Sequence, residues 1–213
     1  MKIVFGFTLI EMALVLIILG LLMGSLLFPL PKQIEQKRIN ITQQRLDEIK
    51  EALLGFAVLH NRLPCPASDE NGLESTCNNE GNIPWRVLGV GRYDTWGNPF
   101  RYRVDSKYTV QLVPTDPLAP IPPNTSSGLV VQDTHLMTPI KLVAPESETT
   151  TSRVVAIIFS YGKDRQANAE NSGVVDHIYA QDAYVENTFD DILIWLPKSI
   201  LINRLVAAKK WLP

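Results

Sequence analysis

The chain has 213 residues, of which 46% are hydrophobic, and a formal net charge of -2 at pH 7. This length and composition suit one apolar segment followed by one globular domain. The balanced charge argues against a protein that binds nucleic acid through a basic surface, so we expect no nucleic-acid partner.

The first thirty residues combine a short polar leader with a long apolar run. Lys2 is the only cation before residue 32, and the run from Met12 to Leu30 has no charged residue. Glu11 stands just before that run, where a carboxylate in a membrane costs roughly 2.5 kcal/mol or more and needs a partner. We therefore predict one membrane-crossing helix from Phe7 to Leu30. By the positive-inside rule, Lys2 places the following domain in the periplasm.

The cleavage position differs from that of a secretory signal peptide. Such a peptide is cut beyond its apolar segment, and no A-x-A-like site clearly follows Leu30. The natural cut here lies before the apolar segment, after Gly6. It would make Phe7 the new amino terminus, four residues from Glu11.

The run Gly6-Phe7-Thr8-Leu9-Ile10-Glu11 resembles the type IV prepilin signature. The resemblance implies that a prepilin peptidase of the inner membrane cleaves after Gly6 and methylates Phe7. It also implies that Glu11 pairs with the terminal amine of a neighbouring subunit during assembly. The alternative is an ordinary single-span anchor, which explains neither the short leader nor the carboxylate.

The helical pattern changes beyond the apolar run. Pro29 and Pro31 predict a kink or a melted turn over Phe28–Pro31. From Lys32 to about His60 the pattern becomes that of an amphipathic helix. Its apolar face contains Leu46, Ile49, Leu53 and Phe56.

Two cysteines, Cys65 and Cys77, follow this helix at close spacing. Oxidising conditions in the predicted periplasmic location permit a disulfide between them. A metal pair is the alternative, but the spacing is not C-x-x-C and no histidine lies nearby at ligand spacing. We favour the disulfide.

The remainder of the chain has the composition of short strands between polar loops. Val154–Tyr161 is a continuous β-branched run and is predicted to be the central strand. Phe100–Val104 and Tyr108–Val113 are predicted to form a hairpin. Further strands are expected at Leu129–Val131, Ile140–Val143 and Ile192–Leu196, a terminal helix at Ser199–Lys210, and polar connectors at Thr115–Ser127 and Glu146–Ser152.

The run from Asp94 to Tyr102 is similar to the D-x-W-G-N-P-x-x-Y pattern that opens the first hairpin in pseudopilins of type II secretion systems. The same residues also describe a turn with an aromatic anchor. Both interpretations give Trp96 and Tyr102 a packing role without chemistry.

Oxygen-bearing side chains are frequent between Asp164 and Asp191, and calcium prefers such ligands. Ser160–Asp164 and Asp190–Trp195 are similar to the two ends of the calcium-binding loop of major pseudopilins. The resemblance implies a calcium site at Asp164, Asp190 and Asp191. The loop is longer here, lacks that family's glycine-rich stretch and does not match an EF-hand, so a solvated acidic loop is the alternative.

We predict that the chain is not an enzyme. The three histidines, His60, His135 and His177, are far apart in the sequence. There is no zinc-protease motif, nucleophile elbow, Walker loop or dinucleotide fingerprint.

The combined prediction is an α+β protein with a type IV pilin-like fold. A leader, residues 1–6, precedes a transmembrane and assembly helix, residues 7–31. The periplasmic domain, residues 32–213, includes the amphipathic half-helix 32–60, an antiparallel sheet and an extra C-terminal helix. The predicted location is the bacterial inner membrane, crossed once, and then the filament.

The resemblance implies a minor pilin of a type IV pilus or a pseudopilin of type II secretion. Its expected partners are other pilins or pseudopilins, the prepilin peptidase, the inner membrane and the assembly platform in it. Two alternatives stay open. One is a pilus-borne binding module, such as an adhesin or DNA-uptake pilin, that uses the loops Thr115–Ser127 and Arg165–Asn187. The other is a membrane-anchored periplasmic enzyme.

Overall fold

The fold comes from a computed structural model. It describes residues 6, 8–27, 30–77, 80–111, 129–133, 141–143, 154–172, 177–185 and 188–210. The chain divides into two compact units, Met1–Asn40 and Ile41–Pro213. The class is α+β with an antiparallel sheet, as predicted.

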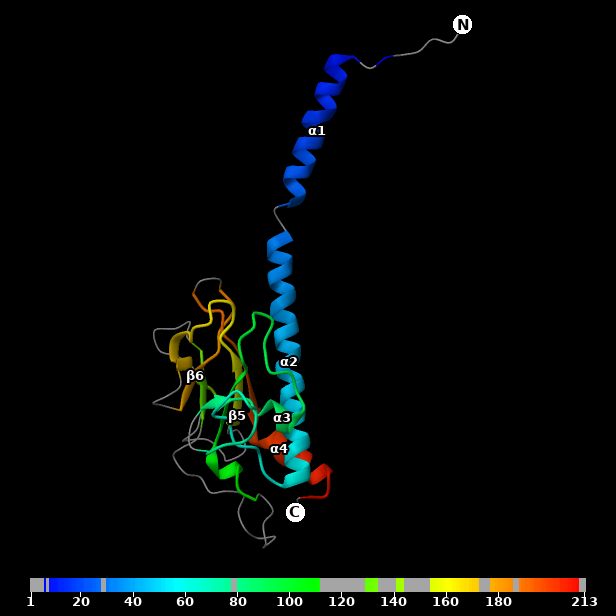
Figure 1. Cartoon of the computed structure of the whole chain (residues 1–213). Coiled ribbons are helices and arrows are strands. Elements are labelled where there is room, and N and C mark those ends of the chain that lie inside the picture. The colour runs from blue at the N-terminus through cyan, green and yellow to red at the C-terminus, as the bar shows by residue number, and fades with distance from the viewer. Residues whose placement is uncertain are drawn as a thin grey trace. The chain divides into compact units, whose positions relative to one another are not determined.

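The first unit contains two helical segments. Helix α1 covers Leu9–Leu27, and helix α2 starts at Leu30 and continues into the second unit, ending at His60 (Figure 1). The predicted kink falls at the boundary between them, where Phe28 and Pro29 lie outside the described residues. Pro31 lies in the first turn of α2, where a missing N–H breaks no helical hydrogen bond.

The predicted membrane crossing is wrong. Within the described parts of the chain, no helix is long and apolar enough to span a bilayer. Helix α1 has 19 residues. At about 1.5 Å per residue it rises about 28 Å, short of the roughly 30 Å of a hydrocarbon core. The same finding contradicts the predicted location as a single-pass inner-membrane protein with a periplasmic domain.

The C-terminal part of α2 belongs to the second unit and carries a buried apolar face. Leu46, Ile49 and Leu53 are buried, together with Phe56 and Ala57. These residues recur at three- and four-residue spacing, which places them on one side of a helix. The predicted amphipathic helix and its end at His60 are confirmed.

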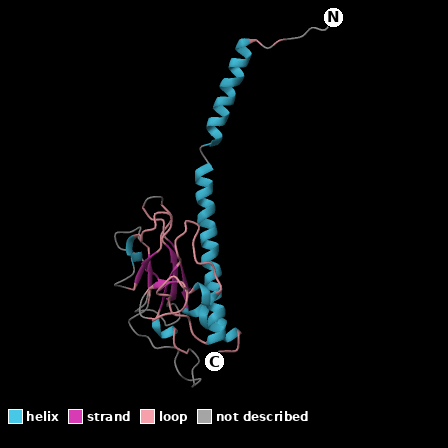
Figure 2. Cartoon of the chain, viewed as in Figure 1, coloured by secondary structure: helices cyan, strands magenta, loops and turns pink. Residues whose placement is uncertain are grey.

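The main sheet has four antiparallel strands in the order β1-β2-β5-β7. Figure 2 draws the strands in magenta. They are β1 (Gly81–Asn82), β2 (Arg101–Val104), β5 (Val154–Ser160) and β7 (Ile192–Pro197). Ile158 of β5 faces Tyr102 on one side and Ile194 on the other. All seven residues of β5 are buried, which confirms the predicted central strand.

A second sheet contains β3 (Val130–Gln132), β4 (Lys141–Val143) and β6 (Ile178–Ala180), with β3 in the middle. Strand β3 pairs antiparallel with β4 and parallel with β6. A bridge between Leu129 and Val154 connects the two sheets. The strands predicted near residues 130 and 141 are confirmed, whereas β6 was not predicted. The connectors Thr115–Ser127 and Glu146–Ser152 lie outside the described residues.

The predicted hairpin after β2 is wrong. Residues Ser106–Tyr108 form a 3-10 helix and residues 109–111 are not in a strand, while residues 112–113 of the predicted second strand lie outside the described residues. Asp105 caps it, because its carboxylate accepts a hydrogen bond of 3.1 Å from the Lys107 N–H. Strand β2 instead pairs antiparallel with β5, about fifty residues further along the chain.

The remaining helical elements are short. Helix α3 covers Trp85–Leu88, a second 3-10 helix covers Ala169–Ser172, and α4 covers Lys198–Ala207. Leu201 and Leu205 of α4 are buried, which confirms the predicted terminal helix. Arg204 of α4 forms an ion pair with Glu51 of α2, so these two helices are in contact within the second unit.

Candidate functional site

The predicted assembly motif lies at the start of α1. Gly6 is exposed and precedes the helix, and Glu11 lies in its first turn. Phe7, the predicted methylation site, lies outside the described residues. Glu11 is the only charged residue in the sequence of α1, and its side chain is exposed. The motif therefore presents a carboxylate beside an apolar helix surface.

Thr8 stands at the start of helix α1, a role that was not predicted from the sequence. Its hydroxyl lies 3.4 Å from the backbone nitrogen of Glu11, which donates to it. Its carbonyl accepts from the N–H groups of Glu11 and Met12 at 3.1 and 3.2 Å. Threonine followed three residues later by glutamate is a helix-start signature, so the signal was present in the sequence.

The apolar side chains of α1 are exposed along the part of the helix whose side chains are described. The exposed fraction is 91% for Leu9, 78% for Ile10, 67% for Leu16 and 71% for Leu21. Apolar surface of this extent is costly in water and marks an interaction site. These side chains are not buried by the rest of the described chain, so we expect another molecule to bury them.

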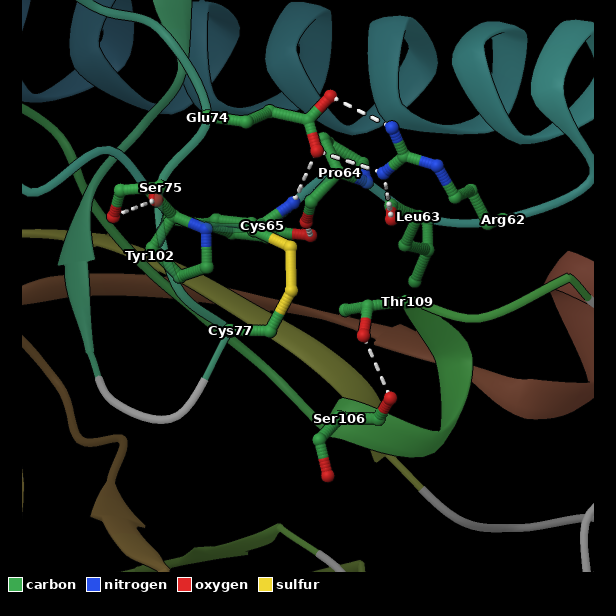
Figure 3. Close-up of polar contacts among 11 residues, drawn as sticks. Arg62, Leu63, Pro64, Cys65, Glu74, Ser75, Cys77, Tyr102, Ser106 and Thr109 are labelled. Carbon is green, nitrogen blue, oxygen red and sulfur yellow. Dashed lines mark hydrogen bonds and ion pairs between the residues drawn. A yellow bond between two sulfur atoms is a disulfide. The ribbon is translucent and has the colours of Figure 1, made fainter.

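The predicted disulfide between Cys65 and Cys77 is present, with 4.8 Å between the two Cα atoms. It closes a loop after α2 (Figure 3). Glu74 lies inside this loop, and its carboxylate forms hydrogen bonds of 2.7 and 3.0 Å with the Arg62 guanidinium. The same carboxylate accepts from the Cys65 N–H at 2.9 Å. The loop is thus held both covalently and by an ion pair.

The ionisation of Arg62 and Glu74 follows from these contacts. Hydrogen bonding to Glu74 raises the pKa of Arg62. Burial tends to raise the pKa of Glu74, but the hydrogen bonds from Arg62 and the Cys65 N–H outweigh it and lower the pKa overall. Both groups are therefore charged near neutral pH, and the pair stabilises the loop.

The residues of the Asp94 motif form a buried polar network. One oxygen of Asp94 accepts from the N–H groups of Trp96 and Asn98 at 2.8 and 2.7 Å. The other accepts from the Asn98 amide at 2.9 Å and from the Ser160 hydroxyl at 2.6 Å. The Asn98 amide also donates to the Gly162 carbonyl. The network ties the turn to the end of β5, which is a structural role.

Tyr102 has the packing role predicted for it. Its side chain is fully buried, and its hydroxyl donates to the Pro64 carbonyl at 3.1 Å. Burial raises the pKa of the Tyr102 hydroxyl well above its usual value. The neutral hydroxyl is therefore the stable form, and it links β2 to the segment before Cys65.

The predicted calcium ligands Asp164, Asp190 and Asp191 accept hydrogen bonds, mostly from backbone N–H groups. One Asp190 oxygen accepts from the N–H groups of Lys163 and Asp164 at 2.5 and 2.8 Å. Asp191 accepts from the Asn168 N–H at 2.9 Å and the Asn171 amide at 2.8 Å. Its other oxygen is buried without a hydrogen-bond partner among the described residues.

The described residues contain no group of three or more histidine, cysteine, aspartate or glutamate side chains that could hold a metal ion. Burial raises the pKa of Asp191 to about 7 and also raises the pKa of Asp190. The calcium hypothesis stays a prediction, because residues 173–176 and 186–187 of this loop lie outside the described part.

We expect the Asp191 carboxyl to make the folded chain less stable as pH rises from about 4 to about 7. In this window the folded state keeps the proton that the unfolded state has lost, because the pKa of Asp191 is about 7 when folded. Each factor of ten in proton affinity is worth about 1.4 kcal/mol, so the loss of stability is at most about 4 kcal/mol. Urea unfolding of the full chain across this window, with a calcium chelator present, measures the slope.

The matched variant is Asp191→Asn, whose amide imitates the protonated carboxyl. Its unfolding free energy should depend less on pH, and it should exceed the wild-type value at the upper end of the window. Equal pH slopes in the two proteins would refute the role of Asp191. Repeating the titration with calcium in place of the chelator shows whether a cation stabilises the ionised form.

The histidines do not form a catalytic group in the described structure. His60 stacks on Phe56 with 4.2 Å between ring centroids. His177 lies elsewhere, with its Nδ1 atom 3.0 Å from the Arg103 guanidinium. His135 lies outside the described residues. The prediction that the chain is not an enzyme stays a prediction.

Comparison with known proteins found no matching family model, no similar curated protein and no similar solved structure.

Proposed function

We propose that this chain is a structural subunit of a filament of the type IV pilin class, either a minor pilin or a pseudopilin. Copies assemble by packing their α1 helices together. A prepilin peptidase removes residues 1–6 and methylates Phe7, and Glu11 then pairs with the amine of a neighbouring subunit. The observation that carries the proposal is the exposed apolar surface of α1.

Burial of α1 against other helices supplies the driving force for assembly. Removing apolar surface from water gains about 25 cal/mol per Å², so several large side chains together yield many kcal/mol. Leu9, Ile10, Leu16 and Leu21 are more than half exposed and are available for such contacts. Gly20 has open space around its Cα, which permits close approach of a second helix.

The second unit supports a pilin-like fold. The buried face of α2 and the four-stranded antiparallel sheet belong to the same compact unit. The Asp94 network fixes the turn before β2, the segment that resembles the pseudopilin pattern. A filament subunit of this class needs both an apolar helix for assembly and a separate folded unit, and the chain has both.

Processing after Gly6 is tested by the intact mass of the purified chain from cells that contain or lack a prepilin peptidase. We expect the mass to fall by residues 1–6 and to rise by one methyl group only when the peptidase is present. The matched control is a Gly6→Val variant, because the added side chain changes the residue before the cut and should leave the leader attached. An unprocessed chain in both strains would contradict the proposal.

A further inference from the structure

A concave pocket of about 280 Å³ lies between the disulfide loop and the edge of the main sheet. Residues 66–68 and 75–76 of the loop form one side, and residues 80–82 with Arg101 form the other. Ser75 and the disulfide that closes the loop are visible in Figure 3.

The pocket walls are held in place by several contacts. Ala67 and Asn82 exchange two backbone hydrogen bonds of 2.9 Å, which join the loop to β1. The backbone N–H and the hydroxyl of Ser75 both donate to the Pro66 carbonyl at 3.1 Å. Together with the disulfide, these contacts fix the shape of the pocket before any ligand binds. A preformed site costs less ordering entropy on binding.

The polar groups at the sheet side are also preorganised. The side chain of Glu80 is only 4% exposed, and one of its oxygens accepts from the Arg101 Nε and Nη2 atoms at 3.0 and 2.7 Å. Tyr179 donates to the other oxygen at 2.9 Å. Arg101 Nη1 donates to the Asn82 side-chain oxygen at 3.0 Å. The negative charge of Glu80 and the positive charge of Arg101 cancel, so the lining of the pocket has no net charge.

The remaining polar side chains of the lining are hydroxyls and an amide, which both donate and accept hydrogen bonds. Ser68 and Thr76 are exposed at the loop side of the pocket. The Asn82 amide and the Arg101 guanidinium offer donors opposite them. A neutral ligand with many hydroxyl groups satisfies such a lining, because each hydroxyl also donates and accepts. A phosphate or a metal cation finds no uncompensated charge there.

We propose that this pocket binds a neutral saccharide unit. The inference does not depend on the proposed filament function, because the pocket residues lie in the second unit and α1 lies in the first.

The test is calorimetric titration and saturation-transfer NMR on the full chain, kept in solution with a detergent that has no sugar headgroup. The probes are glucose, galactose, mannose and N-acetylglucosamine with their short oligomers, a glycine–serine peptide and inorganic phosphate. We expect at least one saccharide to bind with a millimolar or lower Kd. The double variant Ser68→Ala, Thr76→Val should weaken that binding about tenfold or more, because two hydrogen bonds are lost.

Ser199→Ala, an exposed hydroxyl on α4 outside the pocket, is the matched control and should bind as the wild type does. Near-ultraviolet circular dichroism of each variant verifies that the fold is retained. The proposal is overturned if no saccharide binds, if the double variant binds as tightly as the wild type, or if the peptide or phosphate takes the site instead.

Discussion

Glu11→Ala is expected to abolish incorporation of the chain into filaments. Glu11 is the only charged residue in the sequence of α1 and stands among exposed apolar side chains. When such helices pack together, the carboxylate is buried and requires the amine of a neighbouring subunit. Removing one partner of a buried ion pair costs about 3–5 kcal/mol, which is more than a hundredfold in association. Immunoblots of sheared filaments against whole cells measure the incorporated fraction.

Two further variants separate charge from general damage. Glu11→Gln keeps the shape of the side chain and removes its charge, so it should fail in assembly as Glu11→Ala does. Glu48→Ala removes an exposed carboxylate from α2 and should assemble normally. Wild-type incorporation of Glu11→Ala would show that Glu11 does not contribute to assembly.

Asp94→Ala is expected to destabilise the second unit by about 3–5 kcal/mol, comparable to breaking a buried charged network. The carboxylate is 4% exposed and accepts four hydrogen bonds, which join the Trp96–Asn98 turn to Ser160. Alanine leaves those buried donors without a partner, and each unsatisfied buried donor costs about 1–3 kcal/mol. Urea unfolding of the full chain at neutral pH measures the difference.

Asp94→Asn should have an intermediate effect. Its amide oxygen still accepts from the backbone of the turn, but its amide nitrogen is unable to accept from Ser160 or from the Asn98 amide. Asp47→Ala, an exposed carboxylate on α2, should change stability by no more than about 0.5 kcal/mol. A loss below about 1 kcal/mol for Asp94→Ala would mean that the network is not important for stability.

The elements that were predicted correctly are those with a clear hydrophobic pattern within their own residues. The apolar spacing of Leu46, Ile49 and Leu53 predicted the buried face of α2, and the β-branched run from Val154 predicted the central strand. The hairpin prediction was wrong because alternating apolar and charged residues indicate a strand but do not specify which strand it pairs with. Strand β2 pairs with β5, and the Asp105 carboxylate favours a 3-10 turn where the hairpin was expected.

The second sheet illustrates a different limit. Strand β6 has only three residues, Ile178–Ala180, and its parallel pairing with β3 joins segments almost fifty residues apart. A run of that length has no periodicity of its own, so only tertiary context defines it. The membrane crossing was predicted over Phe7–Leu30, whereas helix α1 covers only Leu9–Leu27, and no described helix is long and apolar enough to span a bilayer.

The candidate site was only partly predictable from the sequence. The disulfide between Cys65 and Cys77 is confirmed. The roles of Gly6 and Glu11 were inferred from the resemblance to the prepilin signature and stay predictions. Asp190 and Asp191 were predicted to be calcium ligands from a resemblance to the calcium-binding loop of major pseudopilins, but backbone N–H groups of the preceding loop donate hydrogen bonds to them. Which hydrogen-bond donors meet a carboxylate depends on contacts about twenty-five residues apart, and composition does not specify those contacts.

Photo-cross-linking from α1 in assembled filaments tests the central claim most directly. A photoreactive amino acid replaces Leu16, an exposed apolar residue of α1, and the same amino acid at Ser199 of α4 serves as the control. We predict that the Leu16 probe links to α1 of a second copy or of another subunit of the same filament, identified by peptide mass, while the Ser199 probe does not. Cross-links from Leu16 that never reach another subunit's α1 would contradict assembly through this helix.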